Sequence, residues 1–203
     1  MRAATQVFEG GFADSVLGSQ EIFRALMDAM ANPGRIVSVG DLAQAPSPLT
    51  PVAASIAATL FDHDATVWCD KPIKASEAAL GWLKFHTGLE LTNDPAGADF
   101  ALVTDIDNMP SFDAFAKGTS EYPDRSTTII LQVAGFEAQT SLTLEGPGIK
   151  GTQAFSPSQL PRMFTEQWAA NRGAFPRGID LIFAGNGLLA ALPRTTRILN
   201  KEA

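Results

Sequence analysis

Two arginines flank a pair of apolar segments near the carboxyl-terminal end of the sequence. The segments, residues 179–184 and 188–192, are joined by a Gly-Asn-Gly link. Glycine and asparagine tolerate positive φ, so the pattern predicts a β-hairpin. Arg177 precedes the first segment, while Arg194 and Thr195 follow the second. Pairing of the two segments would bring Arg177 and Arg194 out close together at one end of the hairpin.

Two guanidinium groups beside a threonine hydroxyl have the chemistry of an anion site, because their forked N–H donors match phosphate or carboxylate oxygens. On this interpretation Arg177, Arg194 and Thr195 hold an anionic ligand. In the alternative interpretation, the arginines pair with acidic side chains of a partner subunit or a neighbouring helix. The local sequence favours the alternative.

A glycine loop follows the predicted strand at residues 141–145 and contains Gly146 and Gly148. Glycine loops after strands can cradle phosphate groups with their backbone N–H donors. This loop has neither the GxxxxGK[ST] nor the GxGxxG spacing, so the sequence alone favours a tight turn.

Asp62, His63 and Asp64 form a run of three ionisable side chains between a predicted helix and a predicted strand. Neighbouring side chains in an extended or turn segment point in different directions, so we expect them not to converge on a metal ion. Among the three, Asp62 is the candidate most worth testing. Cys69 is the single cysteine, which excludes an internal disulfide and a cysteine-rich metal site.

The formal net charge of −7 argues against binding to nucleic acid or to an anionic membrane through bulk charge. From residue 172 onward, however, five cations stand against two acids, a net charge of +3. We call the five cations, Arg172, Arg177, Arg194, Arg197 and Lys201, the basic island. The sequence shows no signal peptide and no apolar run of membrane-spanning length, so we expect a cytoplasmic protein.

Apolar periodicity and capping residues predict helices over residues 20–31, 51–60, 76–86 and 159–171, with a short helical piece over 112–117. Strands are predicted over residues 35–39, 65–69, 98–104, 127–133 and 141–145, followed by the hairpin. This alternation indicates one α/β domain over residues 1–203, with a mixed sheet, flanking helices and a β-hairpin that closes the chain.

The first predicted helix is capped by Ser19, and residues at helical spacing define its expected buried stripe. The stripe consists of Ile22, Phe23, Leu26, Met27 and Met30. Arg24 and Asp28 lie four residues apart on the other face, where they can pair.

A set of short motifs runs in order through the chain. They are residues 23–30, 33–34, 51–55, 59–60, 67–68, 85–87, 98–101, 130–133, 148–149, 175–176, 178–182 and 193–196, with Asp62, Asp64 and Gly146. No single motif is specific, but the ordered set covers almost the whole sequence. It resembles the PhnH family, one of the subunit families of the bacterial carbon–phosphorus lyase system of phosphonate metabolism.

The resemblance implies a fold akin to the large domain of pyridoxal-phosphate-dependent transferases, and a homodimer that associates with other lyase subunits. It also implies that the cofactor-bearing lysine is missing. Lys150 is the one lysine in a loop after a predicted strand, and the family pattern has no fixed lysine there. A chain of 203 residues also lacks room for the second domain that closes over pyridoxal phosphate. We therefore expect no cofactor, no metal and no catalytic residue.

In the system that the resemblance names, phosphonates are joined to a ribose triphosphate from a nucleoside triphosphate. The resemblance implies an accessory role in these early steps, whose intermediates are polyanions. This leads to the hypothesis that Arg194, Thr195 and Arg177 contact a phosphonate or nucleotide anion, or the acidic face of a partner subunit.

Two functional hypotheses follow. In the first, the chain is a non-catalytic accessory subunit of the lyase complex. In the second, it is an enzyme in its own right, a transferase or hydrolase acting on a phosphorylated small molecule, with Arg24, Asp62 and Arg194 converging in a dimer cleft. The sequence shows no recognisable nucleophile–base pair, which favours the accessory subunit.

Overall fold

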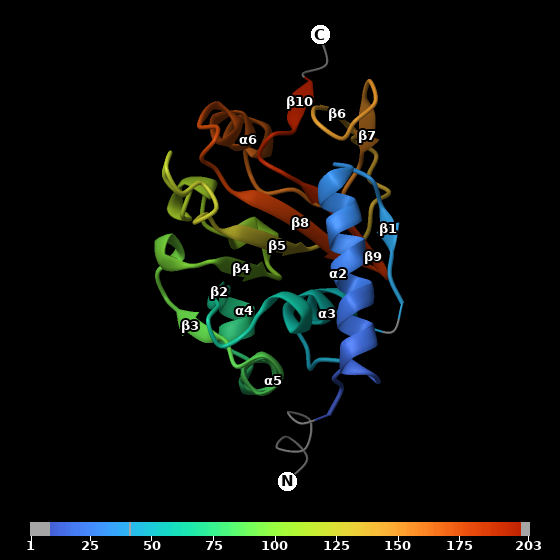
Figure 1. The fold of residues 1–203 in the computed structure, drawn as a ribbon, viewed down its shortest axis with the longest axis vertical. Helices are drawn as coiled ribbons and strands as arrows, with labels where there is room; N and C mark the ends of the chain where they lie inside the picture. Colours follow the sequence, from blue (N-terminus) through green and yellow to red (C-terminus); the bar gives the residue numbers. More distant parts are fainter. Residues whose placement is uncertain (1–8, 41, 200–203) are drawn as a thin grey trace.

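The computed structural model describes residues 9–40 and 42–199. Predictions for the first eight residues, and Lys201 of the basic island, lie outside this part of the chain. The described residues form a seven-stranded sheet with the order β1-β9-β8-β5-β4-β2-β3 and a three-stranded sheet with the order β10-β6-β7 (Figure 1).

The large sheet is mixed, as the sequence predicts. Its strands are β1 (Val37–Ser38), β2 (Thr66–Cys69), β3 (Glu90–Thr92), β4 (Phe100–Val103), β5 (Thr128–Gln132), β8 (Asp180–Gly185) and β9 (Leu188–Leu192). Strands β3, β2, β4, β5 and β8 run parallel, whereas β9 is antiparallel to both β8 and β1. The carboxyl ends of five parallel strands therefore meet at one edge of the sheet.

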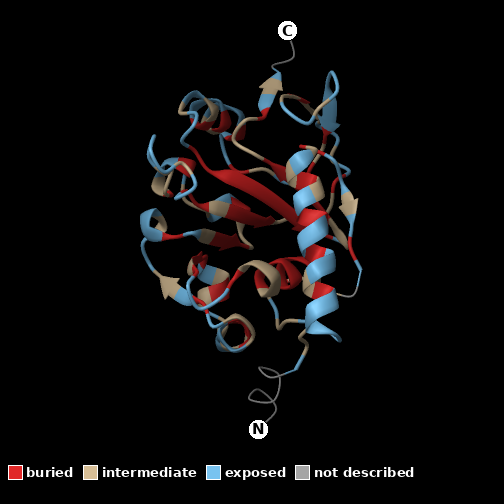
Figure 2. Cartoon of the chain, viewed as in Figure 1, coloured by how far each residue is buried: buried red, intermediate tan, exposed pale blue. Residues whose placement is uncertain are grey.

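Side chains alternate between the two faces of the large sheet, as the period of two in a strand requires. On β5 and β8, Ile130 and Ile182 belong to one apolar cluster, while Leu131 and Phe183 belong to the other. Both faces of these central strands are buried (Figure 2). This explains why their sequences read as continuous apolar runs rather than alternating ones.

The first cluster is covered by α2 (Ser15–Ala31), α3 (Pro51–Leu60), α4 (Lys71–Lys74) and α5 (Glu77–Thr87). The predicted helix at Thr50-Pro51 is confirmed to the residue, because the Thr50 side chain accepts a hydrogen bond from Ala53 N and Pro51 occupies the first turn. Gly88 ends α5 in the left-handed conformation, with a φ of 73°.

The second cluster lies under α6 (Phe164–Gly173), the short turns η2 (Ile106–Asn108) and η3 (Phe112–Ala114), and the small sheet. The small sheet consists of β6 (Leu142–Glu145), β7 (Gln153–Phe155) and β10 (Arg197–Leu199), and a further turn, η1, spans Pro95–Gly97. The strand predicted over residues 141–145 exists but belongs to this separate sheet. The hairpin does not close the chain, because β10 follows it.

The helix predicted over residues 20–31 begins at Ser15, and its cap is Asp14 rather than Ser19. The Asp14 carboxylate accepts hydrogen bonds from the backbone N–H groups of Val16 and Leu17, both at 3.0 Å. The buried stripe is also rotated from the predicted one. Ile22 and Leu26 are buried, but Phe23 and Met27 are 50% and 54% exposed. Small residues, Gly18, Ala25 and Ala29, occupy the buried positions instead.

The expected pair between Arg24 and Asp28 does not form. Asp28 pairs with Arg35 at 3.2 Å, while Arg24 donates a hydrogen bond to Gln20. The helix predicted over residues 159–171 is shorter and starts at Phe164, because Met163 adopts a left-handed conformation with a φ of 51°. Met163 is consequently exposed rather than buried.

The predicted hairpin is confirmed. Strands β8 and β9 pair from Gly185 opposite Leu188 to Leu181 opposite Leu192. Asn186 and Gly187 form the turn with φ values of 52° and 72°, as expected for a two-residue turn that matches strand twist.

Candidate functional site

The most distinctive position of the large sheet lies between β2 and β4. Strand β3 is hydrogen-bonded on one side of β2 and β4 on the other, so the direction of chain progression reverses there. The connection after β2 runs into α4, whose Ile73 packs into the first cluster. The connection after β4 runs into η2, whose Ile106 packs into the second cluster. Because the two connections depart from opposite faces of the sheet, a crevice forms between them at the carboxyl ends of the strands. Open α/β sheets bind ligands at such a position.

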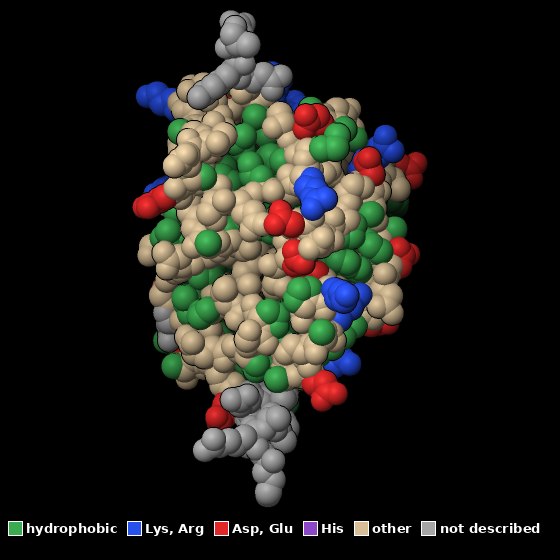
Figure 3. Space-filling view, turned by 180° about the vertical axis from the view of Figure 1, so that it is seen from behind, with side chains coloured by type: hydrophobic (Ala, Val, Ile, Leu, Met, Phe, Trp, Pro, Cys, Tyr) green, Lys and Arg blue, Asp and Glu red, His purple; other side chains and the backbone are tan. Residues whose placement is uncertain are grey.

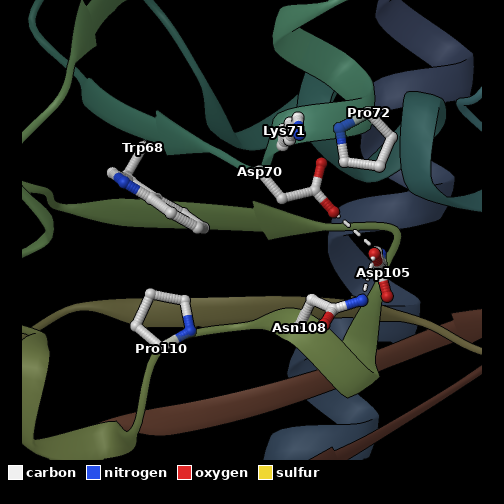
Figure 4. Close-up of a pocket in the computed structure, with 7 residues that line it drawn as sticks. All are labelled: Trp68, Asp70, Lys71, Pro72, Asp105, Asn108 and Pro110. Atoms are coloured by element: carbon white, nitrogen blue, oxygen red, sulfur yellow. Dashed lines mark hydrogen bonds between the residues drawn. The ribbon is translucent and has the colours of Figure 1, made fainter.

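A cavity of about 490 Å³ occupies this crevice (Figure 4). It is lined by Trp68, Asp70, Lys71, Pro72, Asp105, Asn108 and Pro110. The wall formed after β2 supplies Asp70, Lys71 and Pro72, and the chain after β4 supplies the opposite wall. The volume lies within the range of small-molecule sites, roughly 300–1,000 Å³.

Asp70 joins the two walls. Asp70 is only 4% exposed. Its carboxylate accepts hydrogen bonds from the backbone N–H groups of Ile73, Thr104 and Asp105 and from the Thr104 hydroxyl. Backbone donors stabilise a buried carboxylate that lacks a cationic partner. Asp70 therefore fixes the width of the crevice, with both of its oxygens occupied.

Trp68 forms the apolar end of the cavity. Its ring packs edge-on against Phe115, with a centroid separation of 5.6 Å, and the Lys74 ammonium lies 5.2 Å from its centre. Lys74 also donates a hydrogen bond to the side chain of Asn93 at 3.1 Å. These contacts hold the indole ring in a fixed orientation.

Cys69 ends β2 directly before Asp70, but it does not serve as a nucleophile. Burial, together with the nearby Asp70 carboxylate, raises the pKa of the Cys69 thiol to about 12. A thiol reacts as the thiolate, so a buried thiol with a raised pKa is inert near neutral pH. Cys69 therefore supplies no reactive group to the crevice, whose lining offers charges, hydrogen-bonding groups and apolar rings.

The comparisons with known proteins agree over almost the entire chain. Residues 10–199 match the family model described as bacterial phosphonate metabolism protein (PhnH). The chain is 42% identical over 98% of both chains to a protein of Rhizobium meliloti (strain 1021) named alpha-D-ribose 1-methylphosphonate 5-triphosphate synthase subunit PhnH. It is also 31% identical to a putative C-P lyase subunit protein HtxG of Stutzerimonas stutzeri, over 91% of this chain and 87% of that one. The chain belongs to the PhnH family.

Membership of the PhnH family directs attention to the residues singled out in the sequence, of which Arg194 is the most firmly held. Its Nε donates to both carboxylate oxygens of Asp180, at 3.1 and 3.2 Å, and its Nη2 donates to Asp180 as well. Its remaining donors reach the backbone oxygens of Pro123 and Pro176 and the hydroxyl of Ser126. The acidic partner thus lies on the adjacent strand β8, which neither interpretation of the sequence had named.

Thr195 and Gly146 meet in this PhnH chain, since β6 and β10 pair directly beyond them. A Cβ added at Gly146 would lie 3.3 Å from the backbone oxygen of Thr195. Gly148 packs elsewhere, against the end of α2, where an added Cβ would lie 2.0 Å from the oxygen of Ala31. The two glycines are therefore needed for close backbone packing, which supports the tight-turn interpretation of the loop.

Arg177 is exposed and directly follows Pro176, whose backbone oxygen accepts a hydrogen bond from Arg194 at 3.5 Å. Arg24 lies apart, on the outer face of α2 beside Thr59 in a shallow pocket. Asp62 precedes β2, whereas Arg194 is paired with Asp180 at the start of β8, and strands β5 and β4 separate β8 from β2. Within one PhnH chain the sheet therefore keeps Asp62 and Arg194 apart.

The prediction that Asp62, His63 and Asp64 point in different directions is wrong. One ligand atom from each residue lies within 4.8 Å of the others, because the chain turns sharply enough at His63 and Asp64 to bring the three side chains together. His63 Nε2 lies 3.5 Å from the Asp64 carboxylate. All three side chains are exposed, and exposed acidic groups commonly lie close together without binding a metal ion.

Two of the four basic-island cations in the described part of the chain face an acidic side chain. Arg194 pairs with Asp180, and Arg197 lies 3.8 Å from Glu145. Arg172 packs over the ring of Phe175. On the face opposite α2, cations alternate with acids among the described side chains, and no continuous basic surface is visible there (Figure 3).

The sequence interpretation missed Asp70, Lys71 and Asp105, although a signal for the crevice was present. An aspartate follows the end of β2 directly, and another follows β4 after one threonine. Polar residues at the carboxyl ends of adjacent parallel strands mark the ligand edge of an α/β sheet. Recognising this edge requires the strand order, which the sequence did not supply.

Proposed function

We propose that this chain is an accessory subunit of a carbon–phosphorus lyase assembly and supports phosphonate catabolism. Its place would be the early step that joins a phosphonate to the ribose triphosphate of a nucleoside triphosphate. The observation that carries this proposal is the 42% identity, over 98% of both chains, to a protein named as a subunit of such a synthase. Other subunits of the assembly are its proposed partners.

An exposed apolar surface on α2 supports a role in assembly. Val16, Leu17, Phe23 and Met27 are between 50% and 64% exposed. The outer side of α2 is exposed along its whole length, while the inner side is buried against the sheet (Figure 2). Contiguous apolar side chains at the surface are characteristic of protein–protein interfaces. We propose that this face of α2 binds another subunit of the assembly.

The homodimer is likewise a proposal. The outer side of α2 is exposed along its whole length, so a second copy can cover part of it in a two-fold symmetric contact while another subunit covers the rest. Sedimentation of the purified chain would show a dimer that Phe23→Asp converts to a monomer. A wild-type monomer at micromolar concentration would contradict the dimer.

We further propose that the large sheet corresponds to the large domain of pyridoxal-phosphate-dependent transferases, without its cofactor. The mixed seven-stranded sheet with helices on both faces supports this relationship. Lys150, the candidate lysine from the sequence, is exposed in the turn after β6 and does not fit a Schiff-base site, which requires a sheltered lysine. Pyridoxal phosphate added to the protein should produce no new absorption band that survives dialysis.

The proposed location is the cytoplasm. Among the residues that the structure describes, no helix is both long and apolar enough to cross a membrane.

The double variant Phe23→Asp, Met27→Asp tests the assembly function. Both side chains are half exposed, so the variant should unfold at a temperature close to that of the wild type. We expect at least a tenfold loss in co-purification with the other lyase subunits, and poor growth on a phosphonate as sole phosphorus source. Met163→Asp is the matched control, since Met163 is 70% exposed at the start of α6. Wild-type co-purification and growth of the double variant would contradict the proposal.

A further inference from the structure

The crevice between β2 and β4 carries two opposite charges that the chain does not pair. Throughout residues 9–40 and 42–199, the Lys71 ammonium has no hydrogen bond or ion pair in the structure. The Asp105 carboxylate receives a single side-chain hydrogen bond, from Asn108 at 2.9 Å. The other charged groups nearby are satisfied: Asp70 by backbone donors and Lys74 by Asn93.

Lys71 and Asp105 line the same cavity from opposite walls (Figure 4). Asp70 ties these walls together through the backbone N–H of Asp105, at 2.8 Å. The backbone segments that carry the two charges are thus fixed relative to each other without any ligand. Such an arrangement is preorganised for a molecule with a complementary charge at each end.

Apart from the Asn108 amide, the remaining lining of the cavity is apolar. Trp68, Pro72 and Pro110 contribute ring surfaces without free charges. A short carbon chain can lie against these rings while its polar ends reach the two walls. The cavity volume of about 490 Å³ admits a compact molecule of this kind.

The sign of the lining charges argues against a polyanion. Lys71 contributes +1, and Asp70 with Asp105 contributes −2, so the cavity carries a net charge of −1. A nucleoside triphosphate brings several negative charges and would meet two carboxylates. A zwitterion meets both an ammonium and a carboxylate with the correct sign.

We propose that this crevice binds a small zwitterion, whose anionic group pairs with Lys71 and whose ammonium group pairs with Asp105. The assignment of the anionic group as a phosphonate rests on the proposed function. The ligand class is therefore an aminoalkylphosphonate, with its carbon chain packed against Trp68 and the two prolines.

Isothermal titration of the purified full-length chain with 2-aminoethylphosphonate tests the site. Three probes separate the contributions: ethylphosphonate lacks the ammonium, ethylamine lacks the anion, and β-alanine replaces the phosphonate with a carboxylate. We expect 2-aminoethylphosphonate to bind at least tenfold more tightly than each of the three probes. Equal binding of ethylphosphonate would overturn the role of Asp105, and equal binding of β-alanine would overturn the assignment of a phosphonate.

The variants Lys71→Gln and Asp105→Asn test the two charges separately. Each should weaken binding of 2-aminoethylphosphonate at least tenfold, while Asp105→Asn leaves the affinity for ethylphosphonate unchanged. Lys84→Gln and Asp107→Asn are matched controls, because both residues are exposed and do not line the cavity. Wild-type affinity in Lys71→Gln or Asp105→Asn would overturn the proposal.

The same variants distinguish this proposal from the assembly function. Lys71→Gln and Asp105→Asn leave the α2 surface intact, so both should co-purify with the other lyase subunits as the wild type does. If no probe binds while the wild type still co-purifies, the ligand proposal fails and the assembly function stands.

Discussion

Arg194 and Asp180 link the two outer ends of the β8–β9 hairpin through a bidentate ion pair. Asp180 begins β8, and Arg194 lies two residues after the end of β9. The two side chains are 14% and 12% exposed, and the Arg194 backbone N–H also donates to the same carboxylate at 2.7 Å. Through Pro123 and Ser126 the guanidinium further holds the loop before β5. The Arg194–Asp180 pair is therefore a structural crosslink at the amino-terminal edge of the parallel strands.

Replacement of Arg194 with alanine should destabilise the protein strongly. The variant leaves the Asp180 carboxylate largely buried without its cation, which costs about 3–5 kcal/mol for a broken buried pair. Arg194→Lys should recover only part of this loss, because an ammonium cannot donate in a bidentate fork. Urea unfolding measures both, with the exposed Arg177→Ala as the control. A loss below about 1 kcal/mol in Arg194→Ala would show that the crosslink is dispensable.

Asp70 should be more important for stability than an ordinary loop aspartate. Asp70→Ala removes the acceptor for three backbone N–H groups, and unsatisfied buried donors cost about 1–3 kcal/mol each. We expect the free energy of unfolding to fall by about 2–4 kcal/mol, since water reaches part of the opened crevice. Asp107→Ala in the neighbouring turn should change it by less than about 0.5 kcal/mol. Equal effects from the two variants would contradict the crosslinking role of Asp70.

Cys69 should make stability dependent on pH in the alkaline range. Its pKa is about 12 in the folded state against an ordinary value of 9.0, so the unfolded state loses the thiol proton first. Its contribution is complete below about pH 9 and is lost as the pH rises towards 12, at up to about 1.4 kcal/mol per pH unit. The difference in unfolding free energy between wild type and Cys69→Ala should shrink over this window. A difference independent of pH would contradict the burial of the thiol.

Two glycines with similar backbone conformations separate steric from conformational effects. Gly148 and Gly151 have φ values of 82° and 75°. An added Cβ at Gly148 would lie 2.0 Å from the backbone oxygen of Ala31, whereas an added Cβ at Gly151 would have no atom within 4 Å. Gly151→Ala should therefore cost only about 1–2 kcal/mol of left-handed strain. Gly148→Ala should cost at least about 2 kcal/mol more in thermal unfolding, and equal costs would show that the close approach to Ala31 is easily relieved.

Elements with strong local signals were predictable from the sequence. Thr50-Pro51 supplies both a capping hydroxyl and a proline at the first helical position, and α3 begins there. Asn186-Gly187 supplies two residues that tolerate positive φ, and β8 and β9 pair around them. In both cases neighbouring residues decide the conformation, so tertiary contacts were not needed.

Features that depend on tertiary packing were not predictable. The periodicity of α2 selects Phe23 and Met27 as well as Ile22 and Leu26, but small residues occupy the buried positions instead: Ala25 and Ala29 in the first cluster, and Gly18 against Phe12. The strand predicted at residues 141–145 pairs with β7 and β10 in a second sheet. The sequence did not reveal this sheet, because β7 and β10 are too short to be recognised from their residue patterns. The crevice was invisible because it depends on the order of β3, β2 and β4.

The most direct test of the central claim compares turnover by the chain alone with turnover in the presence of the other lyase subunits. The measured reaction is the formation of a ribosyl phosphonate triphosphate from a phosphonate and a nucleoside triphosphate. The accessory role predicts no turnover by the purified chain alone, and a rate for the other subunits that falls at least tenfold when this chain is omitted. Turnover by the isolated chain, or an unchanged rate without it, would contradict the account.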